Sequence, residues 1–102
     1  MSAYMIITAQ VSDRAAFMAG YAPTAAKLVA QFGGKYVLRA PGAQLLEGDF
    51  GDAASVVISE WPDRDAALAF WHSPEYAEAK TLREGIAEVQ LLLVEAPPIS
   101  GA

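Results

Sequence analysis

The sequence predicts a single α+β domain whose elements follow each other in the order βαββαβ. Four stretches rich in β-branched and large apolar residues alternate with stretches whose apolar residues recur every three or four positions. Turn-forming residues such as Gly33 and Pro62 separate these stretches. The 102 residues fit one domain, which we assign to residues 1–96, followed by an exposed tail at residues 97–102.

The first half of the chain predicts a strand, a helical segment and a second strand. Residues 3–11 are apolar in both alternating sets, as in a central strand that is covered on two faces. Ser12 or Asp13 then offers an N-cap for a helical segment that runs to Phe32. Pro23 lacks an N–H for the helical ladder, so we expect a kink or a short break near residues 20–23.

The middle of the chain predicts the second and third strands of the sheet. Residues 35–40 are typical of a strand, and the Pro-Gly step at 41–42 is typical of a turn. We expect residues 43–48 to continue the strand or to form a short hairpin arm. Residues 55–61 predict the third strand, which ends before Pro62.

The last third predicts a second helical segment in two pieces and a final strand. Asp63 caps a helix that carries Leu68 and Trp71. Ser73 then begins a new helix, because its hydroxyl can accept from a free N–H while the proline that follows fits the first turn. Gly85 ends this helix, and residues 88–96 predict the last strand.

This order is the split βαβ, or ferredoxin-like, arrangement, in which an antiparallel sheet carries both helical segments on one face. The other face of the sheet is left open. Because the first and last strands are apolar on both sides, this face needs a cover, and a second copy of the chain is the simplest one. The mean hydropathy of +0.25 agrees with a self-associating subunit. We therefore predict a homodimer through the open sheet face.

Composition excludes several other classes of protein. The formal charge of −5 is built from scattered acids, and no cluster of Lys and Arg could follow a phosphate backbone, so we expect no nucleic-acid partner. No apolar run is long enough to cross a membrane, and residues 1–10 lack the features of a signal peptide, so we expect a cytoplasmic protein. The chain has no cysteine, one histidine and no phosphate-binding or dinucleotide fingerprint, and we predict neither a metal site nor a cofactor.

Four segments carry a resemblance to a known family: GGKYVLR, LLEGDF, ISEWPDRDAALAFWHSPEYAEAKTLREG and VQLLLVE. In their order and spacing, the chain resembles the domain of unknown function 1330 family of short bacterial proteins in the dimeric α/β-barrel superfamily. The resemblance spans nearly the whole chain and implies the ferredoxin-like fold and the dimer. It brings no established reaction, although relatives in the superfamily include cofactor-free monooxygenases, haem-degrading enzymes and small-molecule isomerases.

The chain departs from the catalytic patterns of those relatives. The monooxygenases often carry an Asn one helical turn before a Trp, whereas Ala67 stands one turn before Trp71 and the chain contains no Asn. The haem-degrading relatives use a His further beyond the Trp. Here His72 follows Trp71 directly and therefore points about 100° away from it on a helix. Neither activity is carried over by the resemblance.

Six residues are candidates for a site between the sheet and the helices. Trp71 and Tyr76 would form an aromatic wall, with a core role as the alternative. Arg39 or Arg83 would fix a negative group; the alternatives are a strand-end ion pair from Arg39 to Glu60 or Glu47, and an exposed helix face for Arg83.

Proton transfer has two candidates, Glu60 and His72. For His72 the alternative is a solvent-facing residue at a helix end. Its neighbour Ser73 is explained by a helix cap, not by nucleophilic catalysis. The resulting hypothesis is a homodimer that binds a small acidic or aromatic metabolite, with cofactor-independent isomerisation or oxygenation as the reaction if it is an enzyme. The competing hypothesis is a non-catalytic binding or interaction module in which the charged residues are structural.

Overall fold

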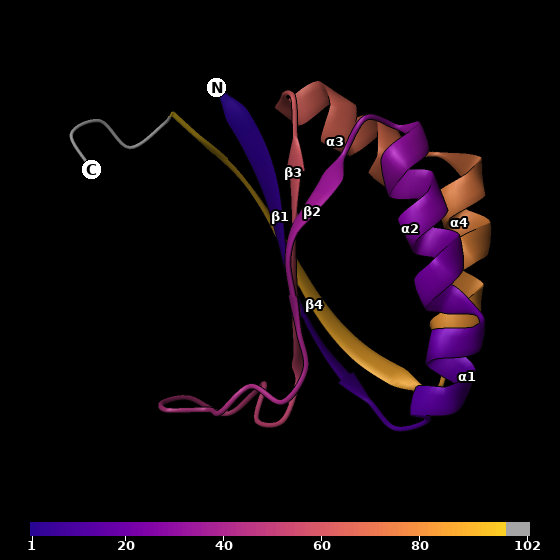
Figure 1. Cartoon of the computed structure of the whole chain (residues 1–102), viewed down its shortest axis with the longest axis vertical. Helices are drawn as coiled ribbons and strands as arrows, with labels where there is room; N and C mark the ends of the chain where they lie inside the picture. The colour runs from indigo at the N-terminus through magenta and orange to yellow at the C-terminus, as the bar shows by residue number, and fades with distance from the viewer. Residues whose placement is uncertain (98–102) are drawn as a thin grey trace.

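The computed structural model describes residues 1–97, which form a four-stranded sheet covered on one side by helices (Figure 1). The elements along the chain are β1 Ser2–Val11, α1 Arg14–Ala19, α2 Tyr21–Gln31, β2 Lys35–Ala40, β3 Ser55–Trp61, α3 Arg64–Trp71, α4 Pro74–Lys80, the 3₁₀ helix η1 Thr81–Arg83 and β4 Ala87–Ala96. This is the predicted ferredoxin-like α+β order, with each helical segment divided in two. Of the expected tail, Pro97 is exposed, and residues 98–102 lie outside the described part.

The sheet is antiparallel, with the strand order β2-β3-β1-β4. Residue Met5 of β1 pairs with Ser59 of β3 and with Leu93 of β4, and these three side chains share the face that meets the helices. The neighbouring register, Ile6 with Ile58 and Leu92, faces the opposite way. The alternation predicted for the strands therefore separates a helix face from an open face.

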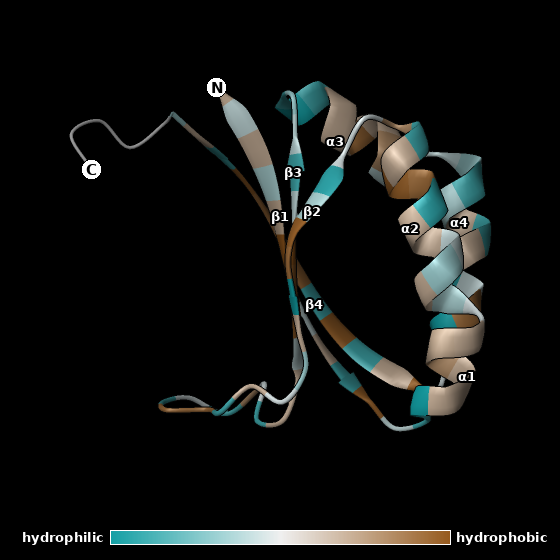
Figure 2. Ribbon diagram, viewed as in Figure 1, coloured by the Kyte–Doolittle hydropathy of each residue, from teal (hydrophilic) through white to brown (hydrophobic). Residues whose placement is uncertain are grey.

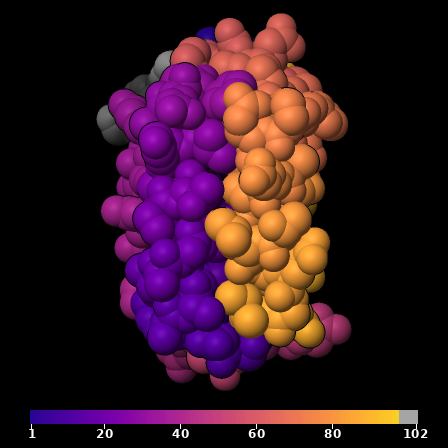
Figure 3. Space-filling view, turned by 90° about the vertical axis from the view of Figure 1, so that its right-hand side faces the viewer, coloured from indigo at the N-terminus to yellow at the C-terminus, as the bar shows by residue number. Residues whose placement is uncertain are grey.

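Capping residues set where the helices begin and end. Asp13 accepts a hydrogen bond from the amide of Ala16 at 3.0 Å, and Asp63 accepts one from Ala66 at 2.8 Å. The break between α1 and α2 falls at Gly20, inside the predicted interval, and Pro23 sits in the first turn of α2, where its missing N–H is not needed. Figure 3 shows the resulting helix layer as two columns, α1–α2 beside α3–α4 with η1.

The core lies between this layer and the part of the sheet where β3 ends, at the top of Figure 1. Trp61 at the end of β3 is 1% exposed, and its ring centroid lies 5.0 Å from that of Phe70 on α3. Phe70 in turn lies 4.4 Å from Tyr76 on α4. Met5 on β1 packs against this cluster from the sheet side. The aromatic cluster thus fixes α3 and α4 against the sheet.

One element prediction is wrong. Residues 43–48 form neither a strand nor a hairpin arm; they belong to the loop between β2 and β3. Asp52 accepts a hydrogen bond from the amide of Leu45 at 3.0 Å, and Ala43 exchanges backbone hydrogen bonds with Ala53 and Ala54, so the loop folds back on itself. It projects away from the helix side of the sheet (Figure 1), and Leu46 within it is 86% exposed.

The open face of the sheet carries apolar side chains without a cover from this chain. Leu38, Leu92 and Val94 are 42%, 64% and 40% exposed. Leu38 pairs with Ile58 and Leu92 with Ile6, both apolar, whereas Val94 pairs with Tyr4. Hydropathy colouring shows apolar segments along β4 and the neighbouring strands (Figure 2). The apolar character expected on both sides of β1 and β4 is therefore present.

Candidate functional site

A cavity of about 310 Å³ lies between the helix face of the sheet and the pair α1–α2. Ile7, Val57 and Val89 line it from three strands. The helices contribute Phe17 and Tyr21 among others. The cavity is at the small end of the range of ligand pockets, about 300–1,000 Å³, and its walls are largely apolar, as is typical of small-molecule sites.

A β-bulge in β2 brings two further polar side chains to the cavity. Tyr36 pairs with Ser59, and the register then shifts so that Leu38 pairs with Ile58 and Arg39 with Val57. Because of the extra residue, Tyr36 and Arg39 both line the cavity, although strict alternation would put residues three apart on opposite faces.

The charge on the walls of the cavity is positive. Arg14 from α1 and Arg39 from β2 line it, and no Asp or Glu does so among the residues that the structure describes. The described part of the chain contains one ion pair, between the Lys35 Nζ and Glu60 Oε1 atoms at 3.5 Å, and it involves neither arginine. A chain with a net charge of −5 thus presents two cations without a carboxylate partner in one hollow.

Two tyrosine hydroxyls meet next to the cavity. The hydroxyl oxygens of Tyr21 and Tyr76 lie 2.7 Å apart, and Tyr21 lines the cavity while Tyr76 is 2% exposed. Burial raises the pKa of the Tyr21 phenol far above its ordinary value, and the nearby Tyr76 adds to this increase. Burial also raises the pKa of Tyr36, against the opposing effect of Arg39. The phenols of Tyr21 and Tyr36 therefore stay neutral near pH 7 and can donate hydrogen bonds.

Arg83 approaches the same pair from η1. Its guanidinium carbon lies 5.4 Å from the centroid of the Tyr21 ring, and its Nε is a buried donor without a hydrogen-bond partner in the described structure. Arg83 does not line the cavity itself. Arg83, which the sequence suggested as a ligand-binding residue, therefore lies against the Tyr21 ring, and its charge acts on the Tyr21 phenol.

Trp71 and Tyr76 lie side by side, with ring centroids 5.4 Å apart, but neither lines the cavity. The Nζ of Lys80 lies 4.5 Å from the Trp71 centroid and 5.8 Å from that of Tyr76, as in a cation–π contact. Tyr76 reaches the cavity indirectly, through its hydroxyl contact with Tyr21. Trp71 is partly buried and packs against the core cluster to which Tyr76 belongs.

Glu60 and His72, the two proton-transfer candidates, lie away from the cavity. Glu60 is on the open face of the sheet, where Tyr4 donates a hydrogen bond to its carboxylate at 3.0 Å; this bond and the charge of Lys35 lower the pKa of Glu60. It pairs with Lys35 and not with Arg39. His72 is an exposed residue at the C-terminus of α3. Ser73 caps α4, since its hydroxyl accepts from the amide of Tyr76 at 3.1 Å.

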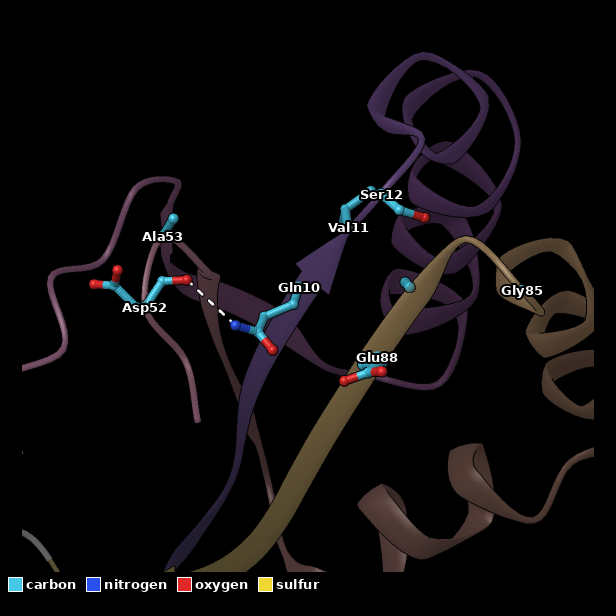
Figure 4. A pocket seen from close by; sticks show the side chains of 8 residues that line it. Gln10, Val11, Ser12, Asp52, Ala53, Gly85 and Glu88 are labelled. Carbon is cyan, nitrogen blue, oxygen red and sulfur yellow. Dashed lines mark hydrogen bonds between the residues drawn. The ribbon is translucent and has the colours of Figure 1, made fainter. Parts of the chain in front are cut away.

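A second, more open hollow of about 540 Å³ lies where β1 and β4 approach the β2–β3 loop (Figure 4). Gln10 donates to the backbone oxygen of Asp52 at 3.3 Å, and Glu88 lies on the neighbouring strand. No group of three or more His, Cys, Asp or Glu residues with metal-binding geometry exists among the described residues. This hollow lacks the apolar walls of the first cavity and offers no cluster for chemistry.

Sequence reasoning missed three residues of the cavity: Arg14, Tyr21 and Tyr36. Tyr21 belongs to the apolar stripe of the first helical segment, and that pattern alone does not distinguish a core tyrosine from one that lines a cavity. Tyr36 and Arg39 were predicted in one strand, but their common face depends on the bulge, which leaves no clear mark in the sequence.

The fold and this cavity define a class: ferredoxin-like α+β proteins with a hollow between the sheet and its helix layer. Within this class, the chain belongs to the family described as domain of unknown function DUF1330, whose model matches residues 2–97. The resemblance noted in the sequence is thus confirmed. No curated protein matches the chain. No helix in the described part is long and apolar enough to span a membrane.

Several solved structures are similar to this chain. RPA0582, a protein of unknown function from Rhodopseudomonas palustris, is 19% identical, with a TM-score of 0.77 over 96% of this chain and 84% of that one. SnoaB, a cofactor-independent oxygenase from Streptomyces nogalater, is 22% identical, with a TM-score of 0.69 over 99% and 98%. A dimeric ferredoxin-like protein of unknown function from Jannaschia sp. CCS1 is 10% identical, with a TM-score of 0.72 over 94% and 100%. At these identities the likeness establishes the fold.

Proposed function

We propose that this protein binds a small organic anion in the cavity between the sheet and α1–α2. The observation that carries the proposal is the pair Arg14 and Arg39 on the wall of an otherwise largely apolar hollow without a carboxylate. Both arginines are exposed to solvent, and an exposed guanidinium next to an apolar surface can bind a ligand with a negative group and an apolar body. Arg39 is the stronger candidate for the contact, since the bulge and the Tyr36 ring, 4.8 Å from its guanidinium carbon, hold it at the wall.

The size and walls of the cavity point to the class of ligand. A volume of about 310 Å³ suits a molecule with one or two rings. Phe17, Tyr21 and Tyr36 offer aromatic surfaces against which such a ring could pack. The ligand we propose is therefore a small aromatic acid, in agreement with the acidic or aromatic metabolite expected from the sequence.

Binding is a better supported proposal than a reaction. SnoaB is a cofactor-independent oxygenase, and this chain shares its fold, but Glu60 and His72 lie outside the cavity, and burial raises the pKa values of the Tyr21 and Tyr36 phenols that line it. Neutral phenols donate hydrogen bonds and are poor bases near pH 7. If the protein catalyses cofactor-independent isomerisation or oxygenation, a group of the ligand itself would therefore have to act as the base.

We propose in addition that the protein is a homodimer through its open sheet face. The supporting observations are the exposed apolar side chains of Leu38, Leu92 and Val94 and the dimeric state of the similar Jannaschia protein. A second copy would offer the same apolar face and bury both.

The binding proposal is tested with the variant Arg39→Gln and the probe 4-isopropylbenzoate. The dissociation constant, measured by calorimetry, should rise about tenfold in the variant, as expected for the loss of one partly exposed charge-assisted hydrogen bond. The control is Arg64→Gln, which removes the same charge from the exposed N-terminal turn of α3 and should leave the affinity unchanged. If Arg39→Gln lowers stability and leaves the affinity as it is, the charged residues are structural and the non-catalytic interaction module is the correct hypothesis.

A further inference from the structure

The Tyr21–Tyr76 contact is asymmetric with respect to its surroundings. Tyr76 is 2% exposed, and within the described structure its hydroxyl has one hydrogen-bond partner, the hydroxyl of Tyr21 at 2.7 Å. Tyr21 lines the cavity and Tyr76 does not, so of the two phenols only Tyr21 can meet a molecule that fills that space. One hydroxyl thus has a single possible partner, and the other has two.

Hydrogen-bond satisfaction fixes the direction of this contact. A phenol carries one proton to donate, and a buried donor without an acceptor is costly. If Tyr21 donated to Tyr76, the proton of Tyr76 would have no acceptor among the described residues. If Tyr76 donates to Tyr21, both protons can be satisfied, since the proton of Tyr21 can point into the cavity.

We infer that Tyr76 donates to Tyr21 and that Tyr21 donates its own proton to an acceptor oxygen of the ligand in the cavity. This inference rests on the proposed function and makes Tyr21 a ligand-contacting residue. Tyr76 is then a positioning residue, which acts on the ligand through Tyr21. The chain Tyr76–Tyr21–ligand gains strength from cooperativity, because accepting one hydrogen bond makes a hydroxyl a better donor.

The surroundings of the pair hold it in place. Ser73 accepts the amide N–H of Tyr76, and the Phe70 ring lies 4.4 Å from the Tyr76 ring. Phe17 lies 5.0 Å from the Tyr21 ring, and the Arg83 guanidinium carbon lies 5.4 Å from it. The Arg83 cation is attracted to the face of the Tyr21 ring. Its charge opposes the rise in the pKa of the Tyr21 phenol, as expected for a stronger O–H donor.

Two contacts together narrow the class of ligand. Arg39 selects a carboxylate or a similar anion, and Tyr21 selects a neutral acceptor such as a carbonyl oxygen elsewhere on the same molecule. Both residues line one cavity of about 310 Å³. The class is therefore a one-ring aromatic acid that carries a second, carbonyl-type oxygen.

The direction of the hydrogen bond is tested without a ligand. Tyr21→Phe leaves the buried Tyr76 hydroxyl unpaired, whereas Tyr76→Phe leaves Tyr21 with access to the cavity. We expect the melting temperature of Tyr21→Phe to lie about 4–8 °C below that of Tyr76→Phe. The double variant should be more stable than Tyr21→Phe alone, because no hydroxyl is then left unpaired. Equal or reversed melting temperatures for the two single variants would show that the Tyr76 hydroxyl does not depend on Tyr21 as its sole partner, and would remove the premise on which the direction rests.

The donation to the ligand is tested with two probes of the same shape, 4-acetylbenzoate and 4-isopropylbenzoate, of which the first alone has a carbonyl acceptor. Tyr21→Phe should weaken binding of the acetyl probe about tenfold and change that of the isopropyl probe less than about twofold. Tyr76→Phe should give a smaller loss for the acetyl probe. The 3-substituted isomers are included so that the position of the oxygen is varied.

The outcomes separate the two proposals. If the natural protein binds both probes and Tyr21→Phe affects them equally, Tyr21 is not the donor, while the binding proposal stands. If the natural protein binds none of the probes, the proposed function is overturned and so is the role of Tyr21 toward a ligand. The melting temperatures then still test whether the buried Tyr76 hydroxyl depends on Tyr21 as its sole partner, which is the premise for the direction of the hydrogen bond.

Discussion

Tyr36 and Arg39 share the helix face of β2, and the guanidinium carbon of Arg39 lies 4.8 Å from the centroid of the Tyr36 ring. The bulge between Tyr36 and Leu38 makes this contact possible. Without the extra residue, Arg39 would share a face with the ion pair of Lys35 and Glu60, or Tyr36 would leave the cavity. A local irregularity in one edge strand therefore decides which charged groups reach the candidate site.

The open sheet face predicts an effect of charge on assembly. Leu92→Lys should shift the protein from dimer to monomer in sedimentation at micromolar concentration, because a lysine at this position would have to lose its water on dimerisation. In the single chain Leu92 is 64% exposed, so the fold of the monomer should tolerate the change. Leu82→Lys is the matched control, since Leu82 is 44% exposed on η1, on the helix side. The proposed dimer would be contradicted if the protein without substitutions sediments as a monomer.

Gly34 predicts a steric effect on the core. A Cβ atom at this position would lie 2.8 Å from Cζ2 of Trp61, and the ring cannot move aside because Trp61 is 1% exposed. Gly34→Ala should therefore lower the free energy of unfolding by about 1–3 kcal/mol, measured by urea denaturation. Gly20→Ala serves as the control, because its nearest atom would be the Ala16 oxygen at 3.4 Å, an ordinary contact. Equal stability of the two variants would show that the Trp61 site can relax.

The buried phenols predict a loss of stability at alkaline pH. The pKa values of Tyr21 and Tyr36 are raised in the folded state, chiefly by burial, above the ordinary value of 10.0. The neutral form is therefore favoured by folding, and its contribution is fully present below about pH 10 and declines as the pH rises further. For each protein, the free energy of unfolding between about pH 10 and 11.5 is expressed relative to its value at pH 8. The decrease over this range should be smaller in Tyr36→Phe than in the unsubstituted protein. An identical pH dependence in both proteins would refute the assignment.

Glu60 predicts an effect at acidic pH. The hydrogen bond from Tyr4 is the main cause that lowers the pKa of the Glu60 carboxyl below 4.5, with the charge of Lys35 as a further cause. Its contribution to stability is present above about pH 4.5 and declines as the pH falls through the lowered pKa. In Tyr4→Phe the pKa of Glu60, followed by NMR titration of its side-chain carbon, should rise. The control is Tyr36→Phe, which removes a phenol from the helix face of the sheet and should leave the pKa of Glu60 unchanged.

Much of the fold could be predicted from local signals. The sequence predicts helix caps at Ser12 or Asp13, at Asp63 and at Ser73. In the structure Asp13, Asp63 and Ser73 each accept a capping amide hydrogen bond. Residues 43–48 were mistaken for an extended arm because Leu45 and Leu46 resemble strand residues. Their backbone pairs within the loop instead, and Leu46 stays exposed, so the apolar pattern there does not report burial.

The sequence by itself determined the order of the elements, the caps and the two apolar faces of the central strands, because each depends on residues close together in the chain. The tertiary structure decided which polar groups meet. Tyr21 and Tyr76 are 55 positions apart and touch through their hydroxyls, Arg39 reaches the cavity through a bulge, and Glu60 turns to the open face. These relations depend on register and on the packing of distant elements, for which a local pattern carries no information.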